Sequence, residues 1–152
     1  MYVAGDRADV LLDNVLDAEE GKKYAAYGDP LTGGAPYTIG KGHTGPEVHL
    51  GLVWDDFQIE AAFQLDKASA WQGCYDHFEP WFRQLNFARQ VVLVAMMFQM
   101  GVHRVLEFAN TLAAVRDGHY ALAGDGMRNS AWGRQTPGRV NRMAALMETG
   151  IE

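Results

Sequence analysis

Side chains recur at near-helical spacing in two stretches of the chain. In the first, ADVLLDNVLDAEE, these positions are Val10, Leu11, Asn14, Val15 and Ala18. Gly21 follows Glu20 as a natural stop for this helix. In the second, Asp55 and Gln58 form the pattern of a capping box, which predicts the start of a long helix. Apolar residues then follow at helical intervals, namely Phe57, Ala61, Ala62, Leu65 and Ala68.

The rest of the chain divides into a turn-rich segment and a helical one. GDPLTGGAPYTIGKGHTG, between the first two helices, is dense in Gly, Pro and Thr and predicts a small sheet or hairpin. ARQVVLVAMMFQMG is apolar on nearly all faces, which predicts a buried central helix. From Phe87 onward the composition is helical, with expected stops at Gly101, Gly118 and the GDG sequence at 124–126. These elements predict an α+β fold with a helix-rich C-terminal half.

Length and apolar runs favour a single domain outside the membrane. The 152 residues contain no repeat or linker, so we expect one domain, 1–152. The longest apolar run, Val91 to Phe98, has eight residues, whereas a membrane helix needs about 20. The first residues carry no signal-peptide pattern, which predicts a protein located in the cytoplasm where it is made and without stable membrane insertion.

Charge and cysteine content exclude several classes of protein. The net charge is −6, and residues 1–66 carry twelve acidic residues against four basic ones. This balance argues against a nucleic-acid partner. Cys74 is the only cysteine, which excludes an internal disulfide framework and a cysteine zinc site. His43 and His49 have no further ligands at zinc spacing, so we expect no metal and interpret His43 as a structural group in a tight turn.

Two carboxylates frame the turn-rich segment. Asp29 is the only acidic residue between Glu20 and Glu47, and eight residues separate it from Glu20. Two carboxylates in different environments are what glycosidic hydrolysis needs, because one protonates the leaving oxygen while the other assists the attacking water. Thr38 adds a hydroxyl that suits the binding of this water. Taken alone, such spacing is a weak signal, because most pairs of this kind are solvated surface acids.

The whole segment EGKKYAAYGDPLTGGAPYTIGKGHTG resembles the catalytic segment of the phage-type lysozymes, glycoside hydrolase family 24. Their pattern is Glu, eight residues, Asp or Cys, a short turn, and Thr within a TIGxGH motif. Glu20, Asp29 and Thr38 fall on these three positions. MMFQMG at 96–101 and SAWGRQTPGRVNRM at 130–143 resemble two further blocks of the family, in the same order. The turn from Asp29 to Thr38 holds eight residues, three more than in the T-even members.

The resemblance implies a lysozyme-like fold, with a small β-containing N-terminal lobe joined by a long helix to a helical C-terminal lobe. It also implies a muramidase without a cofactor, acting on the β-1,4 bond between N-acetylmuramic acid and N-acetylglucosamine of peptidoglycan. Glu20 would be the general acid, Asp29 the electrostatic partner or base, and Thr38 the group that orients water. The implied substrate-binding residues of the helical lobe are Phe98, Gln99, Trp132 and Arg139, with Arg139 close to Glu20. From the residues alone, Phe98 and Trp132 fit core packing as well.

Several biological settings are compatible with this interpretation. The implied setting is an endolysin, a monomer that stays in the host cytoplasm until a holin releases it to peptidoglycan in the periplasm. A virion-associated lysozyme domain for wall penetration is the alternative. Other open alternatives are a hydrolase of chitin-like polymers, a non-catalytic glycan-binding domain of the same fold, and a zinc amidase or peptidase that cuts the peptide stem.

Overall fold

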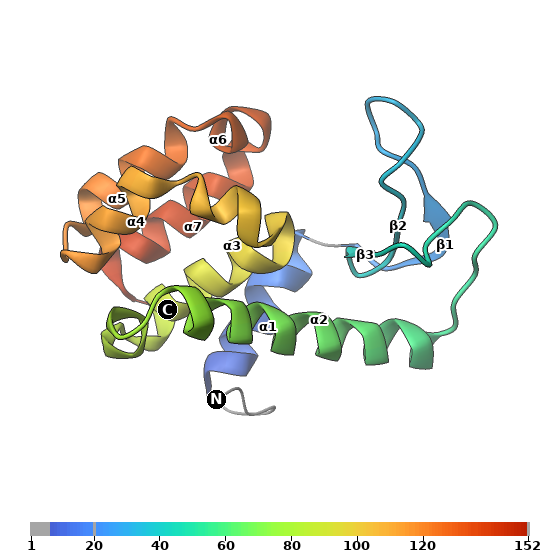
Figure 1. Ribbon diagram of the computed structural model, residues 1–152, viewed down its shortest axis with the longest axis horizontal. Coiled ribbons are helices and arrows are strands. Elements are labelled where there is room, and N and C mark those ends of the chain that lie inside the picture. Colours follow the sequence, from blue (N-terminus) through green and yellow to red (C-terminus); the bar gives the residue numbers. More distant parts are fainter. Residues whose placement is uncertain (1–6, 20, 152) are drawn as a thin grey trace. The chain divides into compact units, whose positions relative to one another are not determined.

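The computed structural model describes residues 7–19 and 21–151, and the side chains of 17–19 are not described further. Helices dominate this part of the chain, and three short strands follow the first helix (Figure 1). The elements in chain order are α1 (Arg7–Glu19), β1 (Lys23–Tyr27), β2 (Thr38–Gly40), β3 (His43–Thr44), α2 (Asp56–His77), the 3₁₀ helix η1 (Trp81–Gln84), α3 (Phe87–Leu106), α4 (Ala109–Arg116), α5 (Tyr120–Arg128), α6 (Ala131–Gln135) and α7 (Pro137–Thr149). The α+β lysozyme-like fold is thereby confirmed.

The chain forms two compact units. The helical unit consists of Met1–Val15 together with Ala70–Glu152, and the sheet unit is Leu16–Ser69. Helix α2 runs from the sheet unit into the helical unit and is the long connecting helix that the sequence predicts.

The sheet unit is built on an antiparallel sheet in the order β1-β2-β3. Tyr27 pairs with Thr38 at one end of the β1–β2 ladder, and Thr38 pairs with Thr44 of β3. On the other side of β1, a bridge joins Ala25 to Val53, so the segment before α2 extends the sheet edge. The turns that the Gly- and Pro-rich sequence predicts therefore do connect short strands.

Helix α2 begins at the predicted capping box. The backbone N–H of Gln58 donates to Asp55 Oδ1 at 2.8 Å, and the backbone N–H of Asp55 donates to Gln58 Oε1 at 3.0 Å. Asp56, in the first turn, accepts bonds from Lys22 Nζ at 2.9 Å and from the Tyr24 hydroxyl at 2.8 Å. These side-chain bonds tie the start of α2 to the beginning of β1.

The buried face of α2 is not the one that the apolar spacing favours. Phe57 and Leu65 are 81% and 72% exposed, whereas Ile59, Phe63 and Lys67 are buried. The two stripes are offset by two residues, which places them about 200° apart around a helix. Both faces of α2 are partly apolar, so the helical period alone does not identify the inner one. The Lys67 ammonium lies over the Phe63 ring, 4.7 Å from its centroid, which makes its burial less costly.

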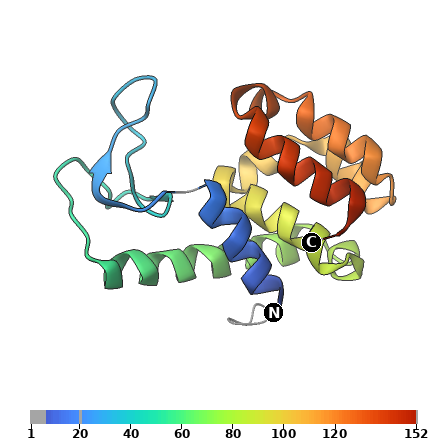
Figure 2. The same cartoon turned by 180° about the vertical axis from the view of Figure 1, so that it is seen from behind.

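Helix α3 is the core of the helical unit, as its sequence predicts. Residues Val91 to Met96 are completely buried, and α7 packs along α3 and α5 (Figure 2). Gly101, with φ of 80°, interrupts the helix at its predicted stop. Within the described residues, no helix by itself has the length and hydropathy to cross a membrane, although α3 and α4, bent by 110°, meet both criteria as a pair.

The GDG sequence, expected to end a helix, lies inside α5, so this prediction is wrong. A Cβ on Gly126 would lie 2.4 Å from Thr111 Oγ1 of α4, and one on Gly124 would lie 2.5 Å from Glu148 Oε2 of α7. These glycines therefore serve close helix packing, which overrides their low helix propensity. The stop is Gly118, with φ of 81°, between α4 and α5.

Candidate active site

Asp29 lies just beyond the end of β1 and organises the turn that follows. Its Oδ1 accepts hydrogen bonds from the backbone N–H groups of Leu31 at 2.8 Å and Thr32 at 3.3 Å. Its backbone N–H donates to Gly34 O at 2.8 Å, and Gly33 N–H donates to Asp29 O at 2.7 Å. One carboxylate oxygen thus holds the loop, and the side chain is half-buried.

Thr38 stands at the same end of the sheet as Asp29. It is half-buried and lies opposite Tyr27, two residues before Asp29 along the chain. Residues opposite each other in an antiparallel pair project from the same face, so Thr38, Tyr27 and Thr44 share one face. The structure therefore brings two of the predicted catalytic residues together. Tyr27 lies beside Thr38 on this face, a neighbour that only the strand register identifies.

Glu20, the predicted general acid, lies outside the described residues. The chain around it is described: α1 ends at Glu19, and β1 begins at Lys23. Its role therefore stays a prediction based on the sequence.

His43 is held on both ring nitrogens by carboxylates of the sheet unit. Nδ1 lies 2.7 Å from Asp66 Oδ2, and Nε2 lies 2.6 Å from Glu47 Oε1. The ring also stacks at a tilt near Trp54, with centroids 5.3 Å apart. Gly45 makes room for this arrangement, since a Cβ there would lie 2.5 Å from Glu47 Oε2. These contacts agree with a structural role for His43.

The contacts of His43 change the pKa values of the three groups. Burial lowers the pKa of His43, but the hydrogen bonds to Glu47 and Asp66 outweigh it and raise the pKa above the ordinary 6.5. The hydrogen bond from His43 lowers the pKa of Glu47 below 4.5. Burial raises the pKa of Asp66, and the contact with His43 offsets only part of this rise. The favourable contribution of His43 to folding is therefore complete below pH 6.5 and is lost as the pH rises through the higher folded pKa.

We expect the substitution His43→Gln to remove this loss of stability above pH 6.5. Between pH 6 and pH 8, the Tm of wild type should fall by more than the Tm of the variant. In a chain of this size, each kcal/mol of unfolding free energy corresponds to about 2–4 °C in Tm. Thermal unfolding followed by circular dichroism at the two pH values measures the difference. His77→Gln, at the exposed end of α2, is the matched control and should keep the wild-type slope. Equal slopes for wild type and His43→Gln would contradict the assignment.

Phe98 and Gln99 lie near the end of the regular part of α3, and both are half-buried. The Oε1 and Nε2 atoms of Gln99 are buried and have no hydrogen-bond partner in the part of the chain that the structure describes. A buried amide without partners costs about 1–3 kcal/mol, which a ligand hydrogen bond would recover. Gln99 is therefore the stronger of the two candidates for binding a polar substrate.

Trp132 is mostly buried on α6, with 9% of its surface exposed. Its ring meets Phe108 edge to face, with centroids 6.0 Å apart. It also lines a hollow of about 240 Å³ together with Arg104, Glu107 and Ser130. The side chain of Trp132 therefore packs in the core, and its role in binding sugar stays a prediction.

Arg139 is half-buried in the first turn of α7, three residues before the exposed Arg142. Arg134, by contrast, donates from Nη1 to the Asn129 carbonyl at 2.6 Å and so fixes the end of α5. Arg142 is an exposed arginine of the same helix as Arg139, and it serves as the matched control.

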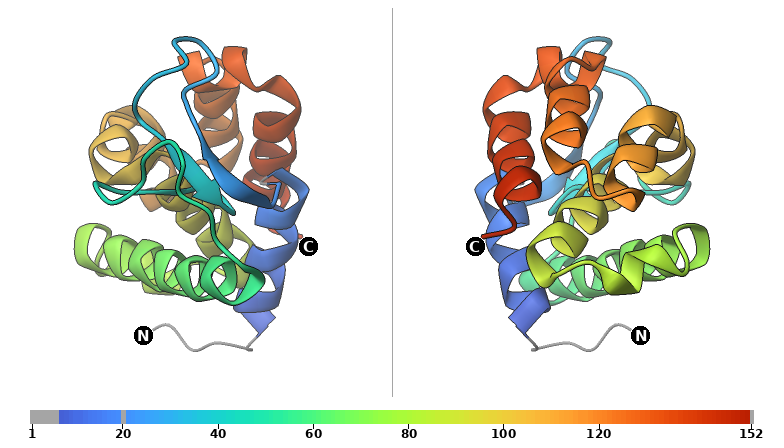
Figure 3. Two further views of the ribbon diagram at one scale, coloured as in Figure 1. Left: turned by 90° about the vertical axis from the view of Figure 1, so that its right-hand side faces the viewer. Right: turned by 90° about the vertical axis from the view of Figure 1, so that its left-hand side faces the viewer.

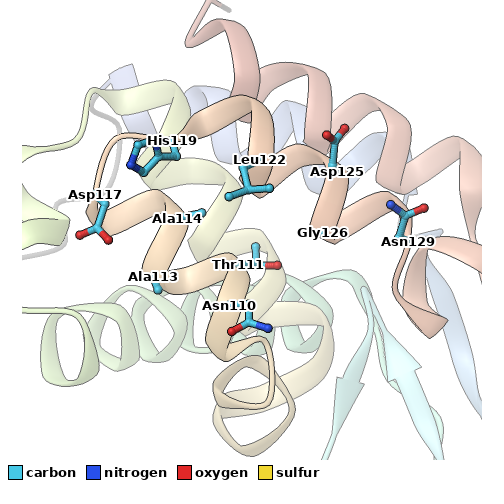
Figure 4. A pocket seen from close by; sticks show the side chains of 10 residues that line it. All are labelled: Asn110, Thr111, Ala113, Ala114, Asp117, His119, Leu122, Asp125, Gly126 and Asn129. Carbon is cyan, nitrogen blue, oxygen red and sulfur yellow. The ribbon is translucent and has the colours of Figure 1, made fainter.

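A larger hollow, of about 560 Å³, lies between α4 and α5 (Figure 4). Asn110, His119 and Asn129 contribute polar groups to it, and Leu122 adds an apolar one. Asp117, at its edge, is engaged by Arg116 through bonds of 3.0 and 3.2 Å. Of the predicted site residues that the structure describes, none lines this hollow.

The fold and the pair Asp29 and Thr38 define a protein of the lysozyme-like class. Comparison of the sequence with protein families gives a more specific result. The model of the phage lysozyme family, described as "Phage lysozyme", matches residues 17–145. The chain belongs to this family.

Individual relatives agree with this assignment. The chain is 29% identical to "Probable T4-type lysozyme 1" of Dictyostelium discoideum, over 91% of this chain and 94% of the relative. It is 34% identical to "Pre-baseplate central spike protein Gp5" of Enterobacteria phage T4, over 58% of this chain but 16% of Gp5. It is 40% identical to "Peptidoglycan hydrolase gp36" of Pseudomonas phage phiKMV, over 42% of this chain and 8% of gp36.

Proposed function

We propose that this protein hydrolyses peptidoglycan as a muramidase, cutting the β-1,4 bond between N-acetylmuramic acid and N-acetylglucosamine. The observation that carries the proposal is the placement of Asp29 and Thr38 at one end of the sheet in a member of the phage lysozyme family. The printed name of the relative gp36, a peptidoglycan hydrolase, supports the substrate class.

The proposed reaction is a single displacement with inversion at the anomeric carbon. Glu20 donates its proton to the glycosidic oxygen as the C–O bond breaks. The Asp29 oxygen that is not bonded to the loop stabilises the positive charge on the sugar and accepts a proton from the attacking water. The Thr38 hydroxyl hydrogen-bonds this water. Inversion of this kind needs the two carboxyl groups to be about 6.5–9.5 Å apart, so that a water fits between sugar and base.

The helical unit supplies the proposed substrate-binding residues. The unpartnered amide of Gln99 offers both a donor and an acceptor to an N-acetyl group or sugar hydroxyl. Phe98 and Trp132 supply apolar contact area, and Arg139 positions Glu20, as the family resemblance implies.

The proposed setting is host lysis by a monomeric endolysin. It would remain in the host cytoplasm until a holin lets it reach peptidoglycan in the periplasm. A virion-associated role is the second candidate. The observation that favours it is the similarity to Gp5 and gp36, both of which are much longer than the matched segment.

Digestion of purified cell walls tests the proposal. We expect a fall in turbidity together with new reducing ends that carry muramic acid, and no release of free peptide stems. A chelator should leave the rate unchanged. New amino groups from released peptides, with activity lost to the chelator and restored by zinc, would indicate an amidase instead. Binding to walls without any new chain ends would indicate a non-catalytic domain.

Arg139→Ala should lower the rate of wall hydrolysis by about 10–100-fold, because a displacement of about 1 Å in a catalytic group can cost about 100-fold. Initial rates on purified walls measure the effect, and circular dichroism checks the fold. Arg142→Ala, on an exposed position of the same helix, is the control and should stay close to wild type. Equal, small effects from both substitutions would remove the support for a positioning role of Arg139.

A further inference from the structure

Helix α2 carries a ridge of exposed, uncharged side chains on the part that belongs to the sheet unit. The ridge consists of four exposed residues spaced four apart: Phe57, Ala61, Leu65 and Ser69. Phe57 and Leu65 expose 81% and 72% of their surfaces. Residues at this spacing form one continuous ridge, the feature through which helices pack against each other. With a rise of about 1.5 Å per residue, this outer ridge is about 18 Å long.

The outer ridge lies on the side of α2 that faces away from the sheet. On the inner side, a Cβ on Gly40 of β2 would lie 3.4 Å from Ile59 Cγ2, and the Lys41 ammonium lies 4.5 Å from the centroid of the Phe63 ring. Figure 3 (left) shows α2, in green, below the strands. The outer ridge is about 160–200° around the helix from Ile59 and Phe63. The inner side therefore packs within the sheet unit, whereas the outer ridge faces solvent.

The charged residues of α2 that flank the outer ridge already have partners in the sheet unit. Glu60 Oε2 lies 3.6 Å from Lys41 Nζ, and Glu60 Oε1 accepts from Gln64 Nε2 at 2.8 Å. Asp66 Oδ2 lies 2.7 Å from His43 Nδ1. Burial of a charge is costly when the charge lacks a partner. A contact through the outer ridge avoids this cost, and its uncharged surface fits an apolar partner surface.

Large and small side chains alternate along the outer ridge, so the ridge is complementary to itself. Two copies of it can run antiparallel about a two-fold axis that passes midway between Ala61 and Leu65. Leu65 of one copy then lies opposite Ala61 of the other, and Phe57 lies opposite Ser69. Each large side chain meets a small one, as close helix packing requires. The two-fold axis makes each of these contacts occur twice.

We propose that two copies of this chain pair antiparallel through the outer ridges of α2. The exposed parts of Phe57 and Leu65, with the residues beside them, amount to about 500 Å² on each copy. The total of about 1,000 Å² lies at the lower limit of specific interfaces, so we expect a reversible dimer with a Kd of about 10–100 μM. At lower concentration the chain is the monomer of the proposed setting. The outer ridge contains none of the predicted site residues, so the pairing does not depend on the proposed function.

Sedimentation equilibrium of the whole chain tests the pairing, at concentrations from about tenfold below to about tenfold above that Kd. We expect the mean mass of wild type to rise from one chain to two. Leu65→Glu and Ala61→Lys should each weaken the dimer by about tenfold or more, because each puts a charge into the apolar contact. Leu122→Glu, the same change at a 63% exposed leucine of α5, is the matched control and should leave the Kd unchanged. Circular dichroism checks the fold of each variant.

An equal mixture of Leu65→Glu and Ala61→Lys tests the antiparallel register. In a mixed pair the introduced carboxylate faces the introduced ammonium, and the other half of the interface keeps Leu65 against Ala61. The mixture should therefore dimerise within a few-fold of wild type. Wild type that stays monomeric at every concentration would overturn the inference, and so would a wild-type Kd in Leu65→Glu. A dimer that both substitutions weaken and the mixture does not restore would overturn the antiparallel pairing.

Discussion

Glu20→Gln is expected to abolish lysis of purified walls while leaving the fold intact. An amide cannot donate the proton that the leaving glycosidic oxygen requires. Removal of a general acid costs about 10²–10⁴-fold in rate. The side chains are nearly equal in size, so thermal unfolding should stay close to that of wild type. Initial rates of turbidity loss and of reducing-end formation measure the effect.

The neighbouring acid provides the control for this experiment. Glu19→Gln makes the same chemical change one residue earlier, so it tests whether loss of a negative charge near the end of α1 is enough to reduce activity. We expect Glu19→Gln to stay within a few-fold of wild type. Activity of Glu20→Gln within that same range would refute the role of Glu20 as general acid, and with it the muramidase mechanism.

The elements of this fold were predictable wherever local chemistry decides the structure. The reciprocal bonds of Asp55 and Gln58 depend only on residues three apart, and the sequence identifies them directly. The buried part of α3 was predictable because its residues are apolar on every face. For the capping box and for the buried part of α3, the residues themselves are compatible with only one local structure.

Other features depend on partners that lie far away along the chain. Phe57 and Phe63 are both aromatic residues of α2, and only tertiary packing decides that Phe63 is buried and Phe57 exposed. Gly126 reads as a helix stop, but its contact with Thr111 of α4 keeps it inside α5. Spacing alone does not contain these contacts, which explains why the expected helix stop at GDG was wrong and why the spacing did not identify the buried face of α2.

The candidate site likewise contains some residues that the sequence identifies and others that only contacts between distant segments reveal. Asp29 and Thr38 were found from the motif, while Tyr27 becomes a candidate only through its pairing with Thr38 across the strands. The hydrogen bonds from Leu31 and Thr32 to Asp29 were likewise not predicted, although Asp before Pro in a turn is a known signal for such bonds. This second task of Asp29 changes how its substitution should be tested.

Substitution of Asp29 is expected to lower the activity of the enzyme in two separable ways, depending on the residue that replaces it. Asp29→Asn keeps an oxygen that accepts the N–H groups of Leu31 and Thr32, but it removes the negative charge. We expect a loss of about 10²-fold or more in the rate of hydrolysis, with Tm close to that of wild type. Asp29→Ala also removes the acceptor, so the two N–H groups of the turn lose their partner.

The comparison between these two variants separates the catalytic task of Asp29 from its structural one. Loss of a hydrogen-bonded acceptor in a partly exposed turn costs about 1 kcal/mol, so Asp29→Ala should unfold about 2–4 °C below Asp29→Asn. Its activity should be equal to or lower than that of Asp29→Asn, because the turn from Asp29 to Thr38 is no longer fixed. Full activity in Asp29→Asn with a lowered Tm in Asp29→Ala would reduce Asp29 to a structural residue of the loop, and the base would have to be another group. The opposite result, equal Tm values and equally large losses of activity, would show that the turn keeps its shape without the carboxylate and that the charge alone matters.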